Sequence, residues 1–148
     1  MISFACAAPV LPAFPLPSSL GSCAIAETVL VVEDEIMVCE LAAEALQEEG
    51  YRVLTASDAD EAEGILAREH VDLLFTDIDL ARNTNGLALA HRARRVRPGL
   101  PVVYTSGGRG HLAHGDAVTD SVFVPKPYRL SALVALANDI LRSHPDHA

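Results

Sequence analysis

Short apolar runs alternate with amphipathic stretches along this chain from Thr28 onward. Most of the runs are continuously hydrophobic, which is typical of strands that are covered on both faces. They lie at residues 28–32, 51–56, 72–76, 101–105 and 122–124. Because strands that alternate with helices along a chain pair in parallel, the pattern predicts one parallel sheet of five strands.

Helical periodicity fills most of the stretches between these runs, where apolar positions recur three and four residues apart. The clearest helices lie at residues 38–46, 62–66, 87–97 and 130–137. A further helix is expected over residues 111–120, but this segment contains Gly115 and few apolar side chains, so it should be short or easily frayed. Together the elements predict an α/β fold, a doubly wound sheet with helices on both faces.

The distribution of charge separates the start of the chain from the rest. No charged residue precedes Glu27, and four of the nine prolines lie within the first 17 residues. A secretory signal is disfavoured, because a basic N-terminal region is lacking and the prolines interrupt the helix that a signal or membrane span needs. We expect residues 1–26 to be a flexible or non-native leader, residues 27–142 to be the folded domain, and residues 143–148 to be a C-terminal tail.

The composition limits the kinds of partner. The chain has 148 residues and is 50% hydrophobic, which is enough for one buried core. Its formal charge is −9. Nucleic acid is a poor partner, because no basic excess exists to displace counterions, and we expect no membrane association. The three cysteines form no CxxC pair, which fits a reducing compartment, so we expect a cytoplasmic location.

Polar residues directly follow four of the predicted strands, at the edge where doubly wound sheets bind ligands. These residues are Glu33, Asp34, Asp77, Ser106 and Lys126, the last being the only lysine among eleven basic residues. An acidic pair at a strand end is most often solvated charge, and a lysine or serine there is often ordinary turn chemistry. Their convergence favours a site: three carboxylates need a cation such as Mg²⁺, and the lysine and hydroxyl suit a phosphoryl group.

Four segments together resemble the response-regulator receiver family of two-component signalling. They are Val29-Leu30-Val31-Val32-Glu33-Asp34-Glu35, Leu73-Leu74-Phe75-Thr76-Asp77, Pro101-Val102-Val103-Tyr104-Thr105-Ser106-Gly107 and Val124-Pro125-Lys126-Pro127-Tyr128. They occur in the family's order on successive predicted strands, and the match spans roughly residues 28–141. The resemblance implies a flavodoxin-like (βα)5 fold in three αβα layers, and a stand-alone phosphoacceptor domain rather than an enzyme.

The resemblance also implies the roles of the acidic residues. Asp77 would accept a phosphoryl group from a phosphohistidine of a sensor histidine kinase or a histidine phosphotransfer protein, giving an aspartyl phosphate. Asp34 and Asp77 would ligate Mg²⁺ by their side chains. Glu33 would act mainly through a bound water, and the backbone carbonyl of Asp79 would complete the protein ligands.

Further roles concern switching. By the same resemblance, Lys126 would hold a phosphoryl oxygen, Ser106 would be the switch hydroxyl and Phe123 the switch aromatic. The Lys126–Pro127 peptide bond is expected to be cis. The signal would leave through the face of the fourth helix, fifth strand and fifth helix, toward an unknown downstream protein or a second copy in a homodimer.

Two departures and two alternatives accompany this interpretation. The loop over residues 78–86 is one residue longer than the commonest family form, and Gly107 leaves little bulk to shield a phosphoryl group. Asp77 and Asp79 also form a DxD pattern similar to that of haloacid-dehalogenase phosphatases. Such a phosphatase would need its metal-binding acidic pair after the lysine, whereas Glu33 and Asp34 precede Lys126. The second alternative is a receiver-like module that binds a partner without phosphate.

Overall fold

The computed structural model describes residues 26–81, 84–107 and 116–142. Its strands are β1 (Thr28–Val32), β2 (Arg52–Ala56), β3 (Leu73–Asp77), β4 (Val102–Ser106) and β5 (Val122–Pro125). Its helices are α2 (Ile36–Glu48), α3 (Ala59–Arg68), α4 (Gly86–Val96) and α5 (Leu130–Arg142). The strands form one parallel sheet in the order β2-β1-β3-β4-β5, which confirms the predicted doubly wound fold.

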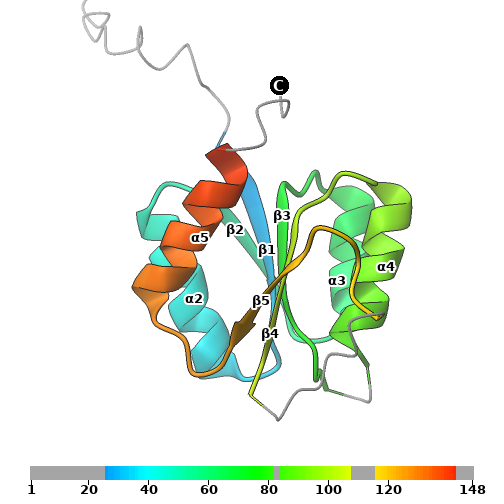
Figure 1. Ribbon diagram of the computed structural model, residues 1–148, viewed down its shortest axis with the longest axis horizontal. Coiled ribbons are helices and arrows are strands. Elements are labelled where there is room, and N and C mark those ends of the chain that lie inside the picture. The colour runs from blue at the N-terminus through cyan, green and yellow to red at the C-terminus, as the bar shows by residue number, and fades with distance from the viewer. Residues whose placement is uncertain (1–25, 82–83, 108–115, 143–148) are drawn as a thin grey trace, which may run out of the picture.

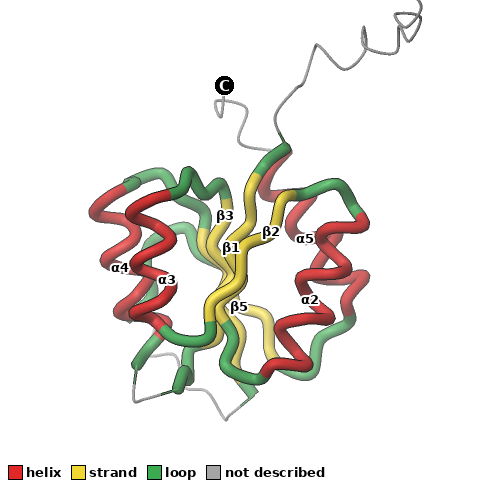
Figure 2. Tube along the Cα trace, turned by 180° about the vertical axis from the view of Figure 1, so that it is seen from behind, coloured by secondary structure: helices red, strands yellow, loops and turns green. Residues whose placement is uncertain are grey.

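The helices cover the sheet from both sides. In Figure 1, α2 and α5 lie on one side of the strands and α3 and α4 on the other, and Figure 2 shows the same three layers from behind. Strands β1, β3 and β4 are buried throughout, whereas β5 at the edge of the sheet is partly exposed. This explains why the central strands are continuously apolar in sequence.

Successive side chains of each central strand enter two different cores, because side chains alternate across a sheet. Leu74 and Tyr104 belong to the core beneath α3 and α4. Phe75 and Val103 belong to the core beneath α2 and α5. Both helix layers are therefore fixed to the strands whose carboxyl ends carry the polar residues.

The expected helix over residues 111–120 is corrected for the part that can be seen. Residues 108–115 lie outside the described residues, and residues 116–120 form turns rather than helix. Asp120 has a φ of 57°, a left-handed conformation that an α-helix does not accommodate. The segment is held by hydrogen bonds instead: the Val118 amide donates to the Tyr104 hydroxyl at 3.1 Å, and Arg94 donates to the Thr119 carbonyl at 2.8 Å.

The predicted leader and tail are not tested by this fold. Residues 1–25 and 143–148 lie outside the described residues, so the expectation for them stays a prediction. Within the described ranges, no helix is both long enough and apolar enough to cross a membrane.

Candidate functional site

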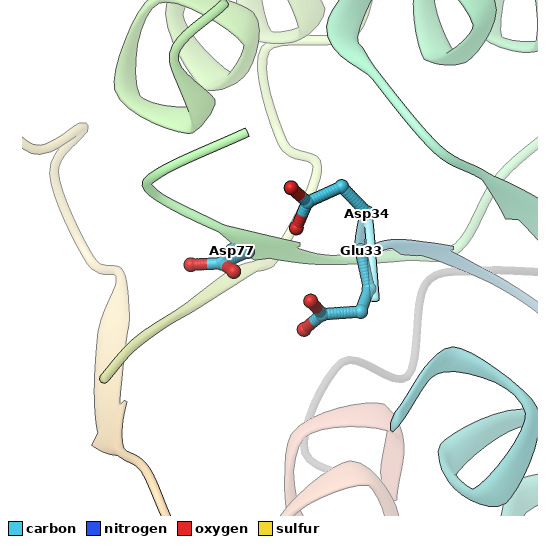
Figure 3. Close-up of side chains that lie close together, drawn as sticks. All are labelled: Glu33, Asp34 and Asp77. Carbon is cyan, nitrogen blue, oxygen red and sulfur yellow. The ribbon is translucent and has the colours of Figure 1, made fainter. Parts of the chain in front are cut away.

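Three carboxylates meet at the carboxyl ends of β1 and β3, because these strands are neighbours in the sheet. Glu33 and Asp34 directly follow β1 and Asp77 ends β3; one oxygen of each lies within 4.8 Å of the others (Figure 3). Glu33 is 3% and Asp77 5% exposed, whereas Asp34 is exposed. Buried like charges at this spacing repel, and a set of hard oxygen donors fits a divalent ion such as Mg²⁺.

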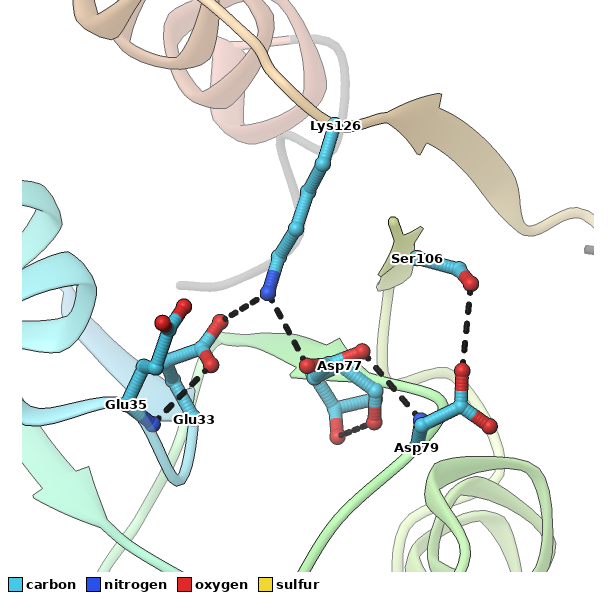
Figure 4. A network of polar contacts seen from close by, with 7 residues as sticks. Glu33, Glu35, Asp77, Asp79, Ser106 and Lys126 are labelled. Atoms are coloured by element: carbon cyan, nitrogen blue, oxygen red, sulfur yellow. Dashed lines mark hydrogen bonds and ion pairs between the residues drawn. The ribbon is translucent and has the colours of Figure 1, made fainter. Parts of the chain in front are cut away.

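Lys126, which follows β5, reaches into this cluster. Its Nζ lies 2.8 Å from Glu33 Oε1 and 3.0 Å from Asp77 Oδ2 (Figure 4). Burial alone would lower the pKa of Lys126, but its hydrogen bonds and ion pairs with the two carboxylates outweigh burial and raise it. Lys126 is therefore a fixed ammonium. The Lys126–Pro127 bond is cis, as predicted.

The buried carboxylate of Glu33 has a raised pKa, so its ionised form is less favoured than that of a carboxylate in water. Burial raises the pKa of Glu33, and the negative charge of Asp77 adds to that effect, while hydrogen bonds from Lys126 and the Glu35 amide oppose it. The Glu35 amide donates to Glu33 Oε2 at 3.1 Å. The buried carboxylate thus depends on its neighbours for its charge, and additional positive charge here would stabilise the ionised form.

Ser106 and Asp79 form a second contact beside Asp77. The Ser106 hydroxyl donates to Asp79 Oδ2 at 3.3 Å, and the Asp79 amide donates to Asp77 Oδ1 at 3.2 Å (Figure 4). Ser106 is only 2% exposed, whereas Asp79 is exposed. For a receiver, the sequence predicted only a backbone role for Asp79, and its side chain entered only the phosphatase alternative; the contact between its carboxylate and Ser106 was not predicted.

The described parts of the loop after Asp77, whose path was uncertain from sequence, pair with each other. Asp79 and Asn85 form an antiparallel bridge, and the Gly86 amide donates to the Ile78 carbonyl at 2.9 Å. Asn85 caps α4 by accepting a hydrogen bond from the Leu87 amide at 2.6 Å. A Cβ at Gly86 would lie 2.1 Å from the Asp77 carbonyl oxygen, so only glycine allows this approach.

The remaining predicted residue, Phe123, lies on the edge strand β5. It is paired in register with Tyr104 of β4, and its side chain is 38% exposed. Its exposure is compatible with a side chain that changes its surroundings, and its switch role stays a prediction.

Tyr128 is a site neighbour that was quoted in the sequence motif without a role. Its ring meets the ring of Phe75 edge-on, with centroids 5.7 Å apart. Burial raises the pKa of Tyr128 to about 12, with a further contribution from the charge of Glu33. With Lys126 and Leu41 it lines a groove of about 310 Å³ between α2 and the start of α5.

Comparison with known proteins gives consistent matches. The family model described as response regulator receiver domain matches residues 29–138. Probable transcriptional regulatory protein TcrX from Mycobacterium tuberculosis is 32% identical over 124 residues, covering 78% of this chain and 50% of TcrX. Nitrogen assimilation regulatory protein NtrX from Azorhizobium caulinodans is 33% identical, covering 80% of this chain and 27% of NtrX. The chain therefore spans half or less of these relatives.

Solved structures agree in fold. A response regulator receiver protein from Sinorhizobium medicae matches with a TM-score of 0.73 and 28% identity, over 80% of this chain and 96% of that one. The receiver domain of NtrX from Brucella abortus matches with a TM-score of 0.66 and 34% identity, over 78% of this chain and 98% of that domain.

Proposed function

Since this chain belongs to the response regulator receiver domain family, we propose that Asp77 accepts a phosphoryl group from a phosphohistidine of a sensor histidine kinase or a histidine phosphotransfer protein. Domains of this family are phosphoacceptor signalling modules rather than enzymes, and they interact with histidine kinases. The observation that carries the proposal is the position of the Asp77 carboxylate, between an ammonium 3.0 Å away and two further carboxylates.

In the transfer, an oxygen of Asp77 forms a bond to phosphorus while the bond between phosphorus and the donor imidazole nitrogen breaks. The nitrogen keeps the electron pair of the broken bond. Lys126 neutralises charge on the phosphoryl oxygens, and its ion pairs with Glu33 and Asp77 support that role by fixing the ammonium where the group would arrive.

Glu33, Asp34 and Asp77 would hold Mg²⁺, with the backbone carbonyl of Asp79 as a further ligand and Glu33 acting mainly through a bound water. When bound, the ion supplies positive charge to the phosphoryl oxygens. The closeness of the carboxylates supports this assignment, because Lys126 supplies a single positive charge to three carboxylates and a divalent cation would relieve the repulsion that remains.

After transfer, Ser106 would donate its hydroxyl to a phosphoryl oxygen, and Phe123 would change its surroundings on the edge strand. The signal then passes to an unknown downstream protein or to a second copy of the chain. The donor would meet exposed apolar side chains near the acidic pair, since Ile36 is 70% and Met37 68% exposed at the start of α2.

The phosphatase alternative is set aside, because the chain belongs to the receiver family and the acidic pair precedes Lys126. Phosphate-independent binding is the competing outcome of a direct test. The protein is incubated with a phosphohistidine-bearing donor, with and without Mg²⁺, and its intact mass is measured. We expect one added phosphoryl group that requires Mg²⁺. No mass increase with a donor active on another receiver would support the binding module.

The boundaries of the domain are part of the proposal, with residues 27–142 as the folded receiver. The amide of Thr28 donates to Asp72 Oδ2 at 2.8 Å, and the Glu27 carbonyl accepts from the Arg52 amide at 2.9 Å. Removal of residues 1–26 would keep both bonds and leave folding intact. Removal of residues 1–28 would break them, and thermal unfolding compares the two truncations.

A further inference from the structure

The side chain of Asp79 has no part in the function proposed above, yet it contacts the switch hydroxyl. Its Oδ2 accepts the hydrogen bond of Ser106 at 3.3 Å, while its own amide is bonded to Asp77 Oδ1 (Figure 4). Asp79 therefore contacts both the phosphoacceptor and the hydroxyl that would report its phosphorylation. The ion pairs of Lys126 go to Glu33 and Asp77.

The loop that carries Asp79 holds this carboxylate in place. The bridge between Asp79 and Asn85 closes the loop, and the Leu80 amide donates to the Thr84 carbonyl at 3.3 Å. Leu80 is buried, which anchors the residue next to Asp79 in the core beneath α3 and α4. An exposed aspartate on an unrestrained loop would lose such a contact readily, whereas this one is positioned by its backbone on both sides.

The chemistry of a hydroxyl makes the contact exclusive. A serine hydroxyl has one proton to donate, so Ser106 cannot donate to Asp79 and to a phosphoryl oxygen at the same time. A phosphoryl group on Asp77 would also bring negative charge close to the Asp79 carboxylate, which repels it. The two bonds of Ser106 thus belong to two different states of the domain.

We propose that the Asp79 side chain is a positioning residue that holds the Ser106 hydroxyl in the unphosphorylated state and must release it when Asp77 is phosphorylated. The inference rests on the proposed function of Asp77 and adds an opposing interaction to it. Loss of the Asp79 carboxylate removes this competing acceptor of the hydroxyl proton and favours the phosphorylated state.

A double-mutant cycle tests the inference through the affinity for beryllofluoride in Mg²⁺, a phosphoryl mimic that binds at the acceptor carboxylate. Asp79→Ala should tighten binding by roughly three- to tenfold when Ser106 is present, the range for one hydrogen bond of modest net strength. In the Ser106→Ala background the same change should have a clearly smaller effect. Asp79→Asn keeps an acceptor oxygen without the charge, so its affinity for beryllofluoride should lie between those of the wild-type protein and Asp79→Ala.

The competing explanation is long-range repulsion between Asp79 and the mimic. It predicts the same tightening in both backgrounds, and that additive result would overturn the inference while leaving the proposed function intact. Asp60→Asn, an exposed aspartate of α3, controls for the loss of one charge and should leave the affinity unchanged.

A second measurement needs no phosphoryl group, so it tests the contact between Asp79 and Ser106 separately from the proposed function of Asp77. In the unliganded domain, Asp79→Ala should shift the backbone amide resonances of Ser106 and Gly107, and Asp79→Asn should shift them less. Unchanged resonances in both variants would overturn the inference. If the wild-type protein binds no beryllofluoride at all, the proposed function fails and the role of Asp79 in it fails too.

Discussion

The Nζ of Lys126 lies 3.0 Å from Oδ2 of Asp77, although the two residues are 49 positions apart in the chain. The contact forms because β5 and β3 both direct their carboxyl ends to one edge of the sheet, with β4 between them. The contact places an ammonium against a buried carboxylate that lies close to two other carboxylates. The site is thus a balance of charge, and changes in that balance give the clearest predictions.

Lys126 should matter more for phosphoryl acceptance than Ser106. Lys126→Ala removes the cation that would face the phosphoryl oxygens, whereas Ser106→Ala removes a single neutral donor. We expect Lys126→Ala to weaken Mg²⁺-dependent beryllofluoride binding at least tenfold more than Ser106→Ala. Isothermal titration measures both affinities, and equal losses would contradict this division of roles.

Mg²⁺ should stabilise the wild-type domain against heat. A cation that binds only the folded state raises the unfolding temperature, and it also relieves the repulsion among Glu33, Asp34 and Asp77. Asp34→Asn should abolish most of this rise, because Asp34 is the exposed member of the cluster and its loss leaves the buried pair with Lys126. Asp60→Asn serves as the control, and a rise that persists unchanged in Asp34→Asn would place the ion elsewhere.

Gly86→Ala should destabilise the fold. The added Cβ would lie 2.1 Å from the Asp77 carbonyl oxygen and 2.9 Å from Thr76 Oγ1, so the backbone at Asp77 must shift. We expect a loss of about 1–3 kcal/mol in the free energy of unfolding. Gly99→Ala is a matched control, because nothing lies within 4 Å of its Cβ position. Chemical denaturation of both variants measures the difference, and equal stabilities would refute the close approach.

Stability should fall between about pH 10 and pH 12 in part through Tyr128. Its pKa is raised by burial from 10.0 to about 12, so in this range the folded protein keeps a proton that the unfolded chain releases. Unfolding then becomes more favourable as pH rises, with a slope of up to one proton. Tyr128→Phe should make the decline less steep. Free energies of unfolding at several alkaline pH values test this, and identical slopes would contradict it.

The sheet could be predicted from sequence because each central strand is covered on both faces and so reads as a continuous apolar run. Strands β3 and β4 nevertheless extend one residue further than predicted, through Asp77 and Ser106. The polar side chains of Asp77 and Ser106 end the apolar pattern, but their backbones still pair with the neighbouring strands. The helix expected over residues 111–120 was wrong in its described part, since a left-handed Asp120 and side-chain hydrogen bonds set that backbone.

The cluster of Glu33, Asp34, Asp77 and Lys126 could be predicted because every parallel strand brings the residue after it to the same edge. The contact between Ser106 and Asp79 could not be predicted this way. It depends on how residues 78–81 and 84–86 pair, which is set by the bridge between Asp79 and Asn85 and by the space that Gly86 leaves. Such a loop closes through backbone hydrogen bonds, which side-chain periodicity does not encode.

We expect Asp77 to be the single phosphoacceptor, and mapping the modified residue distinguishes it from the neighbouring carboxylates. The protein is phosphorylated by a phosphohistidine donor in Mg²⁺, the acyl phosphate is reduced with borohydride, and the peptides are sequenced by mass spectrometry. We expect reduction at Asp77 alone in the wild-type protein and none in Asp77→Asn. Modification at another carboxylate in the wild-type protein, or label retained in Asp77→Asn, would contradict it.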